Sequence, residues 1–166
     1  AVDPIDGTRL LANGLPNAIS VVALAERGKM LRVPRHIVYM DKIAVGADAK
    51  GKIDIEAPVA DNLRAVARAT GKAVQELTVV VLDRPRHSKL IADVRAAGAR
   101  LRLISDGDVA GAIMAAMEEF SGIDMLLGVG GAPEAVIAAA ALKCLGGDLQ
   151  CRFYPRDERE AEAAAA

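Results

Sequence analysis

The segment DPIDGT, close to the start of the chain, combines the residue types of a metal–phosphate site. Asp3 and Asp6 come together if the chain turns at Pro4, and carboxylate oxygens are the ligands that hard divalent cations such as Mg²⁺ prefer. Gly7 permits close approach of a ligand, and Thr8 offers a hydroxyl beside the metal. Proline, aspartate and glycine also form ordinary turns, so a plain turn is the alternative. We favour the metal–phosphate site because every position of the pattern has a use in it.

A second group of candidates, Arg84, Arg86 and His87, follows the apolar run LTVVVL. Arginine matches phosphate oxygens with two parallel N–H donors, and the N-terminus of a following helix attracts anions. Pro85 fixes the backbone between the two arginines. The sequence therefore suggests a phosphate site, and a solvated loop that pairs with acids is the alternative.

Carboxylates follow the next predicted strand as well. Asp106 and Asp108 flank Gly107 directly after ARLRLI. An aspartate in front of a helix is a good N-cap, and glycine suits a turn, so capping alone would explain them. The functional alternative is that one carboxylate accepts hydrogen bonds from sugar hydroxyls while the other caps the helix.

Glu134 stands at the start of an apolar helix, behind the glycine-rich segment GVGGAP. A carboxylate there is favoured by the helix dipole alone, yet Gly128, Gly130 and Gly131 allow a ligand to approach the backbone. Glu134 occupies the place of the small third residue of a dinucleotide-binding G-x-G-x-x-G motif, so such a site is weakly supported. Tyr39 is a ligand contact or a core residue, and Lys42 contacts phosphate or is solvated.

Composition limits the function classes. The chain has 166 residues, 52% of them apolar and 26% charged, and a formal net charge of -1. This describes a globular protein and not a general nucleic-acid or membrane-surface binder, which needs a basic field. Cys144 and Cys151 have no zinc-site spacing and are interpreted as reduced thiols. With no signal-peptide or membrane-span pattern, we expect a cytoplasmic protein that binds neither nucleic acid nor membrane.

Strands and helices must position these candidates. We expect extended segments at 17–25, 30–33 and 37–46, then a connector at 47–52. Beyond it strands and helices alternate, which predicts an α/β fold with a mostly parallel sheet from about 58 to 150. The expected strands are 77–82, 99–104, 124–129 and 149–154, and the expected helices begin at Val59, Leu90, Val109 and Pro133. Ligands bind beyond the carboxyl ends of such strands, so the loops that carry Arg84, Asp106 and Glu134 should meet at one edge.

The motifs together resemble a known family. DPIDGT resembles the signature of the lithium-sensitive, metal-dependent phosphatases, and YMDKIAVG, DRPRH, LISDGD and GVGGAPEAVIAAAALKCLGG, in this order, resemble class II fructose-1,6-bisphosphatases. The resemblance runs from Val2 to about Tyr154. It implies a layered α/β sandwich in which 1–52 is an N-terminally incomplete part of an α+β metal-site domain and 53–155 forms an α/β substrate-binding domain. The last residues, 156–166, have no core-facing apolar stripe, so we expect a frayed tail there.

The resemblance also implies residue roles. The metal, Mg²⁺ or Mn²⁺, would be held by Asp3, Asp6 and Glu134, with Asp6 one methylene shorter than the glutamate often found there. Asp3, Asp6 and Thr8 would be catalytic, Thr8 by orienting or activating the attacking water. The substrate-binding residues would be Gly7, Thr8, Tyr39, Arg84, Pro85, Arg86, Asp106, Gly107, Asp108 and Gly131.

The implied reaction is hydrolysis of the 1-phosphate of fructose 1,6-bisphosphate in gluconeogenesis, with sedoheptulose 1,7-bisphosphate as a second candidate substrate and a homodimer or homotetramer as the assembly. Family members are about twice as long and carry further acidic ligands before DPIDGT. We therefore expect this chain to represent the central and following part of such an enzyme, with little or no activity alone. An inositol-monophosphatase-like phosphatase, a non-catalytic sugar-phosphate-binding module and a purely structural domain are the alternatives.

Overall fold

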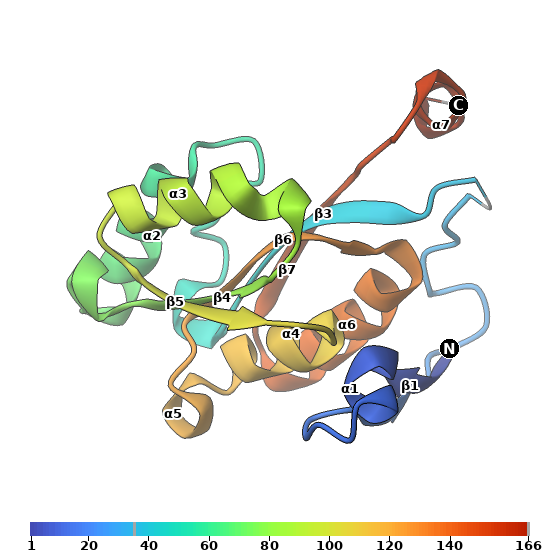
Figure 1. The fold of residues 1–166 in the computed structure, drawn as a ribbon, viewed down its shortest axis with the longest axis horizontal. Helices are drawn as coiled ribbons and strands as arrows, with labels where there is room; N and C mark the ends of the chain where they lie inside the picture. The colour runs from blue at the N-terminus through green and yellow to red at the C-terminus, as the bar shows by residue number, and fades with distance from the viewer. Residues whose placement is uncertain (35, 166) are drawn as a thin grey trace.

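The computed structural model describes residues 1–34 and 36–165 and shows a five-stranded sheet between two layers of helices (Figure 1). The strands are β3 (Tyr39–Val45), β4 (Thr78–Leu82), β5 (Arg100–Ile104), β6 (Met125–Gly131) and β7 (Asp148–Phe153), in the spatial order β5-β4-β6-β3-β7. β4 runs parallel to β5 and β6, whereas β3 runs antiparallel to β6 and β7. The expected α/β sandwich with a mostly parallel half is confirmed.

Alternating side chains along each strand build the two halves of the core. Val79 and Val81 of β4 face α2 (Val59–Thr70) and α3 (Ser88–Ala96), while Val80 faces α4 (Asp108–Ala116) and α6 (Ala132–Leu145). Because both faces of the sheet are covered, the central strands read as continuous apolar runs. The four helices were expected close to these positions, and Gly71 and Gly146 end α2 and α6 as left-handed C-terminal residues.

The first residues of the chain form a separate small unit, which we call the corner: β1 (Val2–Asp6), α1 (Thr8–Ala12) and β2 (Ile19–Val22). β1 and β2 pair antiparallel with each other, and within 1–34 and 36–165 neither pairs with a further strand. Ile19 and Val21 of β2 pack toward Val109 of α4 and Ile137 of α6. The corner is thus attached to the α4–α6 layer by one side of a short two-stranded sheet.

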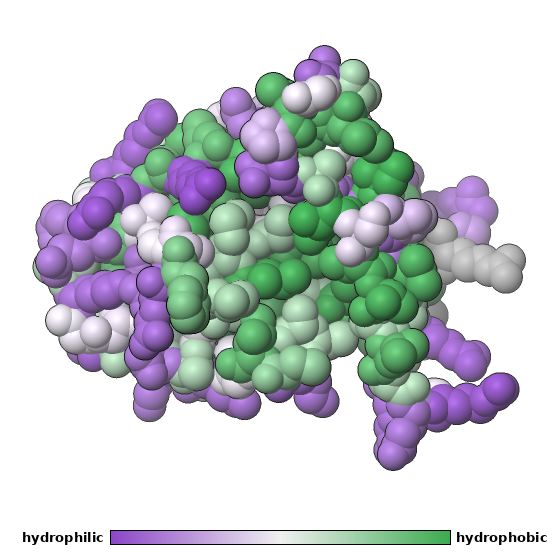
Figure 2. Space-filling model, turned by 90° about the horizontal axis from the view of Figure 1, so that it is seen from below, coloured by the Kyte–Doolittle hydropathy of each residue, from purple (hydrophilic) through white to green (hydrophobic). Residues whose placement is uncertain are grey.

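Two expectations near the corner are wrong. The strand expected over 17–25 is confined to β2, where half-buried and exposed positions alternate, because β1 is the one strand of the described residues that pairs with it. The strand expected at 30–33 does not form; no strand in the described part of the chain pairs with this segment, and Leu31 remains exposed. Large apolar side chains also stay exposed at Val2, Leu11 and Val22. Figure 2, seen from below Figure 1, shows a broad apolar area on this side of the molecule.

The central sheet crosses the expected division at residue 52, because β3 lies between β6 and β7. The tail after β7 forms a helix, α7 (Glu158–Ala165), and Glu160 accepts hydrogen bonds from Arg156; Ala166, at its end, lies outside the described residues, and fraying of the tail stays a prediction. The remaining short elements are α5 (Glu118–Ser121) and 3₁₀ turns at Ala47–Ala49, Val74–Glu76 and Pro85–His87. Within 1–34 and 36–165, no helix is long and apolar enough to cross a membrane.

Candidate active site

A cavity of about 390 Å³ lies at the edge of the sheet where the carboxyl ends of β4, β5 and β6 meet the start of β3. The expected convergence of three loops at one edge is therefore observed. The cavity is lined by Asp6, Val38, Tyr39, Leu82, Arg84, Arg86, Asp106, Gly107, Asp108, Gly130, Gly131, Pro133 and Glu134. Most candidates from the sequence are in this set, and those that are not are Asp3, Gly7, Thr8, Lys42, Pro85, His87 and Gly128.

Arg84 joins two of the loops. Its Nη2 pairs with the Asp106 carboxylate at 3.1 Å, and its Nη1 donates to the Ser105 carbonyl at 2.5 Å. Both side chains of the ion pair are only about one-fifth exposed. The loop after β4 is thereby fixed to the loop after β5, with the guanidinium at the cavity wall.

Arg86 points across the cavity edge toward β6 and β3. Its Nε and Nη2 both donate to the Val129 carbonyl, at 3.2 and 2.8 Å, and its guanidinium lies 5.1 Å from the centroid of the Tyr39 ring. A cation over an aromatic face gains electrostatic attraction. Tyr39 therefore serves as a platform for this arginine. His87, the third member of the predicted loop, is not solvated but buried.

The DPIDGT turn docks onto the turn after β5. The Asp6 carboxylate accepts a hydrogen bond from the Ala110 amide at 3.3 Å, and the Asp106 carboxylate accepts one from the Arg9 amide at 3.1 Å. Residues about a hundred positions apart in the sequence are thus held together, and Asp6 enters the cavity. Asp3 lies further out, where its carboxylate accepts from the Ile5 amide at 3.1 Å. Thr8 is exposed at the start of α1.

Negative charge is concentrated around Asp6. Burial raises the pKa of the Asp6 carboxyl to about 6; the Ala110 N–H opposes this, and the nearby carboxylates Asp108, Asp3 and Glu134 add to it. Like charges disfavour ionisation of a buried acid. The arrangement therefore has a deficit of positive charge beside Asp6.

Glu134 shows the same deficit from the other wall. Its Oε2 is buried and has no hydrogen-bond partner among the residues that the structure describes. The side chain folds back over Gly131 so closely that a Cβ there would lie 1.8 Å from Oε2, so a larger residue at this position would displace the Glu134 carboxylate. An unpartnered buried carboxylate oxygen costs free energy, and a cation would compensate it.

The carboxylate oxygens around the cavity are of the kind that a hard divalent cation prefers, but they are not gathered into a complete metal site. Asp6 and Glu134 supply carboxylate oxygens to the same cavity. In the described part of the chain, however, no three His, Cys, Asp or Glu side chains are gathered into a group that could hold a metal ion. The metal assignment of Asp3, Asp6 and Glu134 stays a prediction.

Lys42 is a buried ion-pair partner, a role that was not predicted from the sequence. This side chain is 2% exposed and pairs with the Asp108 carboxylate at 2.5 Å, so it is not solvated. Gly130 makes room for the pair, since a Cβ there would lie 1.7 Å from Asp108 Oδ2. The sequence does contain a signal for burial of this lysine, because Lys42 lies within the apolar segment YMDKIAVG, which forms the central strand β3. The buried ammonium group of Lys42 thus fixes the position of the Asp108 carboxylate.

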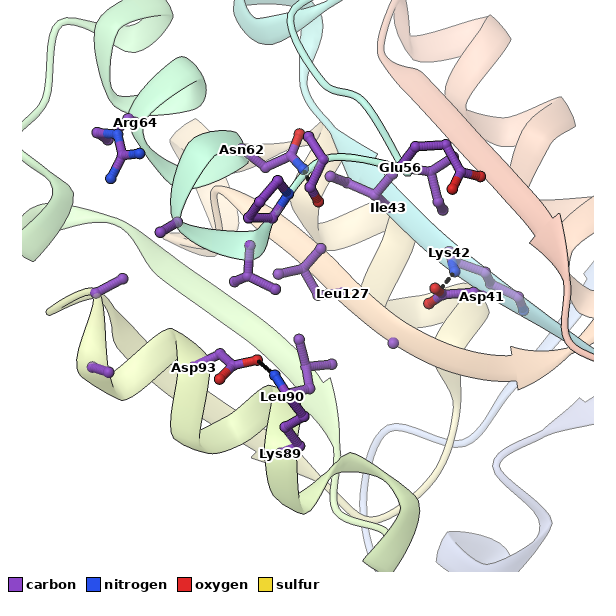
Figure 3. A pocket seen from close by; sticks show the side chains of 18 of the residues that line it. Asp41, Lys42, Ile43, Glu56, Asn62, Arg64, Lys89, Leu90, Asp93 and Leu127 are labelled. Carbon is purple, nitrogen blue, oxygen red and sulfur yellow. Dashed lines mark hydrogen bonds and ion pairs between the residues drawn. The ribbon is translucent and has the colours of Figure 1, made fainter.

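A larger hollow of about 910 Å³ lies elsewhere, between α2 and α3 over β3 and β6 (Figure 3). Several of its charged residues pair with one another: Arg152 with Glu56 and Asp41, and Lys89 with Asp93. Ile43, Leu90 and Leu127 form apolar walls. Of the residues that the motifs singled out, only Lys42 and Gly128 are in its lining. Because the two arginines, Asp6 and Glu134 line the smaller cavity instead, that cavity is the candidate active site.

Known proteins resemble the chain over most of its length. All of residues 1–166 match the family model described as "Bacterial fructose-1,6-bisphosphatase, glpX-encoded". The chain is 47% identical over 158 residues to "Fructose-1,6-bisphosphatase class 2" of Haemophilus influenzae and 48% identical over 158 residues to "Fructose-1,6-bisphosphatase 1 class 2" of Escherichia coli K12. Each alignment covers 95% of this chain and 46% of the relative. The chain thus spans about half the length of the curated relatives it matches.

Proposed function

Because the chain belongs to the bacterial, glpX-encoded fructose-1,6-bisphosphatase family, we propose that its cavity binds a sugar bisphosphate and contributes to hydrolysis of the 1-phosphate of fructose 1,6-bisphosphate. The products are fructose 6-phosphate and inorganic phosphate, and sedoheptulose 1,7-bisphosphate is a second candidate substrate. The observation that carries the proposal is the opposition of Arg84 and Arg86 to Asp6 and Glu134 around one cavity.

In this proposal the arginines recognise phosphate. Arg84 and Arg86 are held at the cavity wall by Asp106 and by the Val129 carbonyl, so little conformational freedom is lost when an anion binds. Their charge neutralises phosphoryl oxygens, and the positioning of the reacting groups supplies most of the rate enhancement in phosphoryl transfer. Asp108, fixed by Lys42, is placed to accept hydrogen bonds from sugar hydroxyls.

In the same proposal, the reacting phosphate binds on the side of the cavity that Asp6 and Glu134 line. Asp6 and Glu134, with Asp3 beside them, would hold Mg²⁺ or Mn²⁺, which when bound polarises phosphoryl oxygens and favours ionisation of a water molecule. Thr8, exposed next to Asp6, would orient the attacking water through its hydroxyl. Water adds to phosphorus as the bond to the sugar oxygen breaks, and the sugar oxygen takes up a proton.

Binding and turnover are tested separately on this chain. Calorimetric titration with fructose 1,6-bisphosphate, with and without Mg²⁺ or Mn²⁺, should show saturable binding that Arg86→Gln weakens about tenfold or more, because a charge-assisted contact is lost. Lys50→Gln is the matched control and should bind as the wild type does, because Lys50 follows the carboxyl end of β3 whereas Tyr39 of the cavity stands at its start. An unchanged affinity of the Arg86 variant would refute the phosphate role.

A phosphate-release assay with the same metals distinguishes the two leading functions. Turnover supports the enzyme, whereas binding without turnover supports a non-catalytic sugar-phosphate-binding module. The incomplete grouping of metal ligands among the described residues favours the second outcome for this chain in isolation. Preference for an inositol monophosphate over the sugar bisphosphate would support an inositol-monophosphatase-like enzyme instead. A cytoplasmic location and a homodimer or homotetramer are part of the same proposal, and analytical ultracentrifugation tests the assembly.

A further inference from the structure

The central sheet opens between β4 and β6, directly beneath the candidate active site. β4 pairs with β5 as far as Leu82, and β6 pairs with β3 as far as Gly131. Between β4 and β6 themselves, however, the paired residues are only Val79 with Met125 and Val80 with Leu126. The two strands therefore part toward their carboxyl ends, where the strand order reverses and ligands bind in folds of this kind.

The imidazole of His87 occupies this opening. Its Nδ1 lies 2.7 Å from the Leu82 carbonyl oxygen on β4, and the Val129 amide of β6 donates to its Nε2 at 2.8 Å. A backbone amide can only donate, so Nε2 carries the lone pair and Nδ1 carries the hydrogen. The ring is thus neutral and has one defined tautomer. It replaces, with a side chain, the hydrogen bonds that the parted strands do not make with each other.

The space around the ring is closely fitted. His87 is 2% exposed. At Gly128 a Cβ would lie 3.0 Å from His87 Nε2 and 3.3 Å from the Leu90 side chain, and the backbone there has a φ of 125°. Only glycine combines this conformation with that clearance. The ring therefore has a fixed position between β4 and β6.

The same bridge reaches the active site through Val129. The Val129 amide binds His87, and the Val129 carbonyl accepts both hydrogen bonds from Arg86. Two consecutive side chains from the loop after β4 thereby hold the two polar groups of one residue of β6. A shift of Val129 would displace the guanidinium from the Tyr39 ring and from the cavity wall.

We propose that His87 is a positioning residue, whose neutral Nδ1–H imidazole holds β6 at a fixed distance from β4 and thereby orients Arg86 toward bound phosphate. The last step rests on the proposed function of the cavity, whereas the bridge itself does not. A protonated ring would direct an Nε2–H against the Val129 N–H, so the bridge requires the neutral form. Burial is the largest effect on the pKa of His87 and lowers it. The positive charges of Arg86 and Arg84 also lower this pKa, whereas the hydrogen bond to the Leu82 carbonyl and the charge of Asp41 raise it.

Nuclear magnetic resonance tests the bridge directly. The chain has two histidines, so a His36→Gln variant assigns the ring nitrogens of His87 without ambiguity. We expect the ¹⁵N signals of His87 to show a single Nδ1–H tautomer, which protonates only below the ordinary pKa of histidine. Averaged tautomers, or titration at the ordinary pKa of histidine, would overturn the proposal whatever the chain binds.

Ligand binding tests the positioning step. His87→Phe keeps a ring but removes both hydrogen bonds, and should weaken binding of fructose 1,6-bisphosphate and of inorganic phosphate about tenfold or more. In the wild type, the Arg86 Nε–H donates to the Val129 carbonyl and should give a nuclear magnetic resonance signal that is protected from exchange with water. The His87→Phe variant should lose this signal. His87→Gln, whose amide oxygen can accept from Val129, should recover part of both, and His36→Gln is the matched control with unchanged binding.

The outcomes separate the two claims. A folded His87→Phe variant that binds both ligands as the wild type does would overturn the positioning role. Should that variant fail to fold, the His87→Gln variant decides: recovery of the Arg86 signal together with affinity supports the role, and wild-type affinity without that signal refutes it. A wild-type chain that shows the expected tautomer but binds neither ligand would refute the proposed function and leave the bridge as a structural feature alone.

Discussion

The candidate active site is assembled from two regions that are held in very different ways. The five-stranded sheet is covered on both faces, and residues such as Val80, Leu63 and Met125 have no exposed surface. The corner has two strands, is attached by one side, and leaves large apolar side chains in water. The sheet region supplies the arginines, Asp108 and Glu134, while the corner supplies Asp6.

In the proposed function, binding and chemistry are divided between these two regions. The arginines that we propose to recognise phosphate are fixed by packed strands and by hydrogen bonds to backbone carbonyls and to Asp106. Asp6, by contrast, is located by two long-range hydrogen bonds, Ala110 to Asp6 and Arg9 to Asp106, and by the contacts of β2 with α4 and α6. We therefore expect the sheet region to determine stability and the corner to contribute to reactivity with little effect on stability.

The largest loss of stability should follow removal of the buried lysine. Lys42→Met leaves the Asp108 carboxylate buried without its cation, which costs about 3–5 kcal/mol. Urea denaturation of the wild type and the variant measures the difference. The double variant Lys42→Met/Asp108→Leu should regain much of the loss, since an apolar pair can replace a buried ion pair; a single variant as stable as the wild type would contradict the buried arrangement.

A matched pair of leucines compares the two regions directly. Leu63→Ala in α2, at a site with 0% exposure, should lower the free energy of unfolding by about 2–5 kcal/mol through lost burial and a cavity. Leu11→Ala in α1, at 56% exposure, should change it by about 0.5 kcal/mol or less. Thermal and urea melts report both. Equal losses would show that the corner is packed as firmly as the sheet.

Removing a carboxylate from the corner should stabilise the chain. Asp6→Asn at pH 8 without divalent metal should raise the free energy of unfolding by about 1–2 kcal/mol, because a buried charge among other carboxylates is lost while the amide oxygen can still accept from Ala110. The same variant should lose any increase in melting temperature that Mg²⁺ or Mn²⁺ gives the wild type. A destabilised variant would mean that Asp6 serves the fold and not the chemistry.

The smallest effect concerns pH. Since the pKa of folded His87 lies below that of the unfolded chain, the unfolded state binds the extra proton first, and stability falls as pH drops below about 6.5. The contribution is fully present above that pH. Relative to the wild type, His87→Gln should show a shallower decline in unfolding free energy between about pH 6.5 and 5. If the unfolding free energies of the wild type and the variant fell in parallel with pH, His87 would have the same pKa in the folded and unfolded chains, as expected for a side chain in water.

Much of the fold followed from local patterns. The helices from Val59 onward and the strands after Leu77 were predicted to within a few residues, because apolar periodicity and the terminating glycines Gly71 and Gly146 are local signals. The segments at 17–25 and 30–33 were predicted less well, because whether an apolar run becomes a buried strand depends on what lies beside it. Likewise, the place of β3 between β6 and β7 has no local signature.

The sequence by itself determined the chemistry available: two arginines around a proline, carboxylates after the strands, a glycine-rich turn before Glu134, and DPIDGT. It also determined that the loops would meet, since parallel strands end at one edge. Only the tertiary structure decided the partners. Lys42 was expected to contact phosphate or to be solvated, and it is buried against Asp108. His87 was expected in a phosphate-binding loop, and its ring joins β4 to β6. The reason is physical: burial and pairing of a polar side chain depend on strands distant in sequence, whereas turns and periodicity depend on neighbours along the chain.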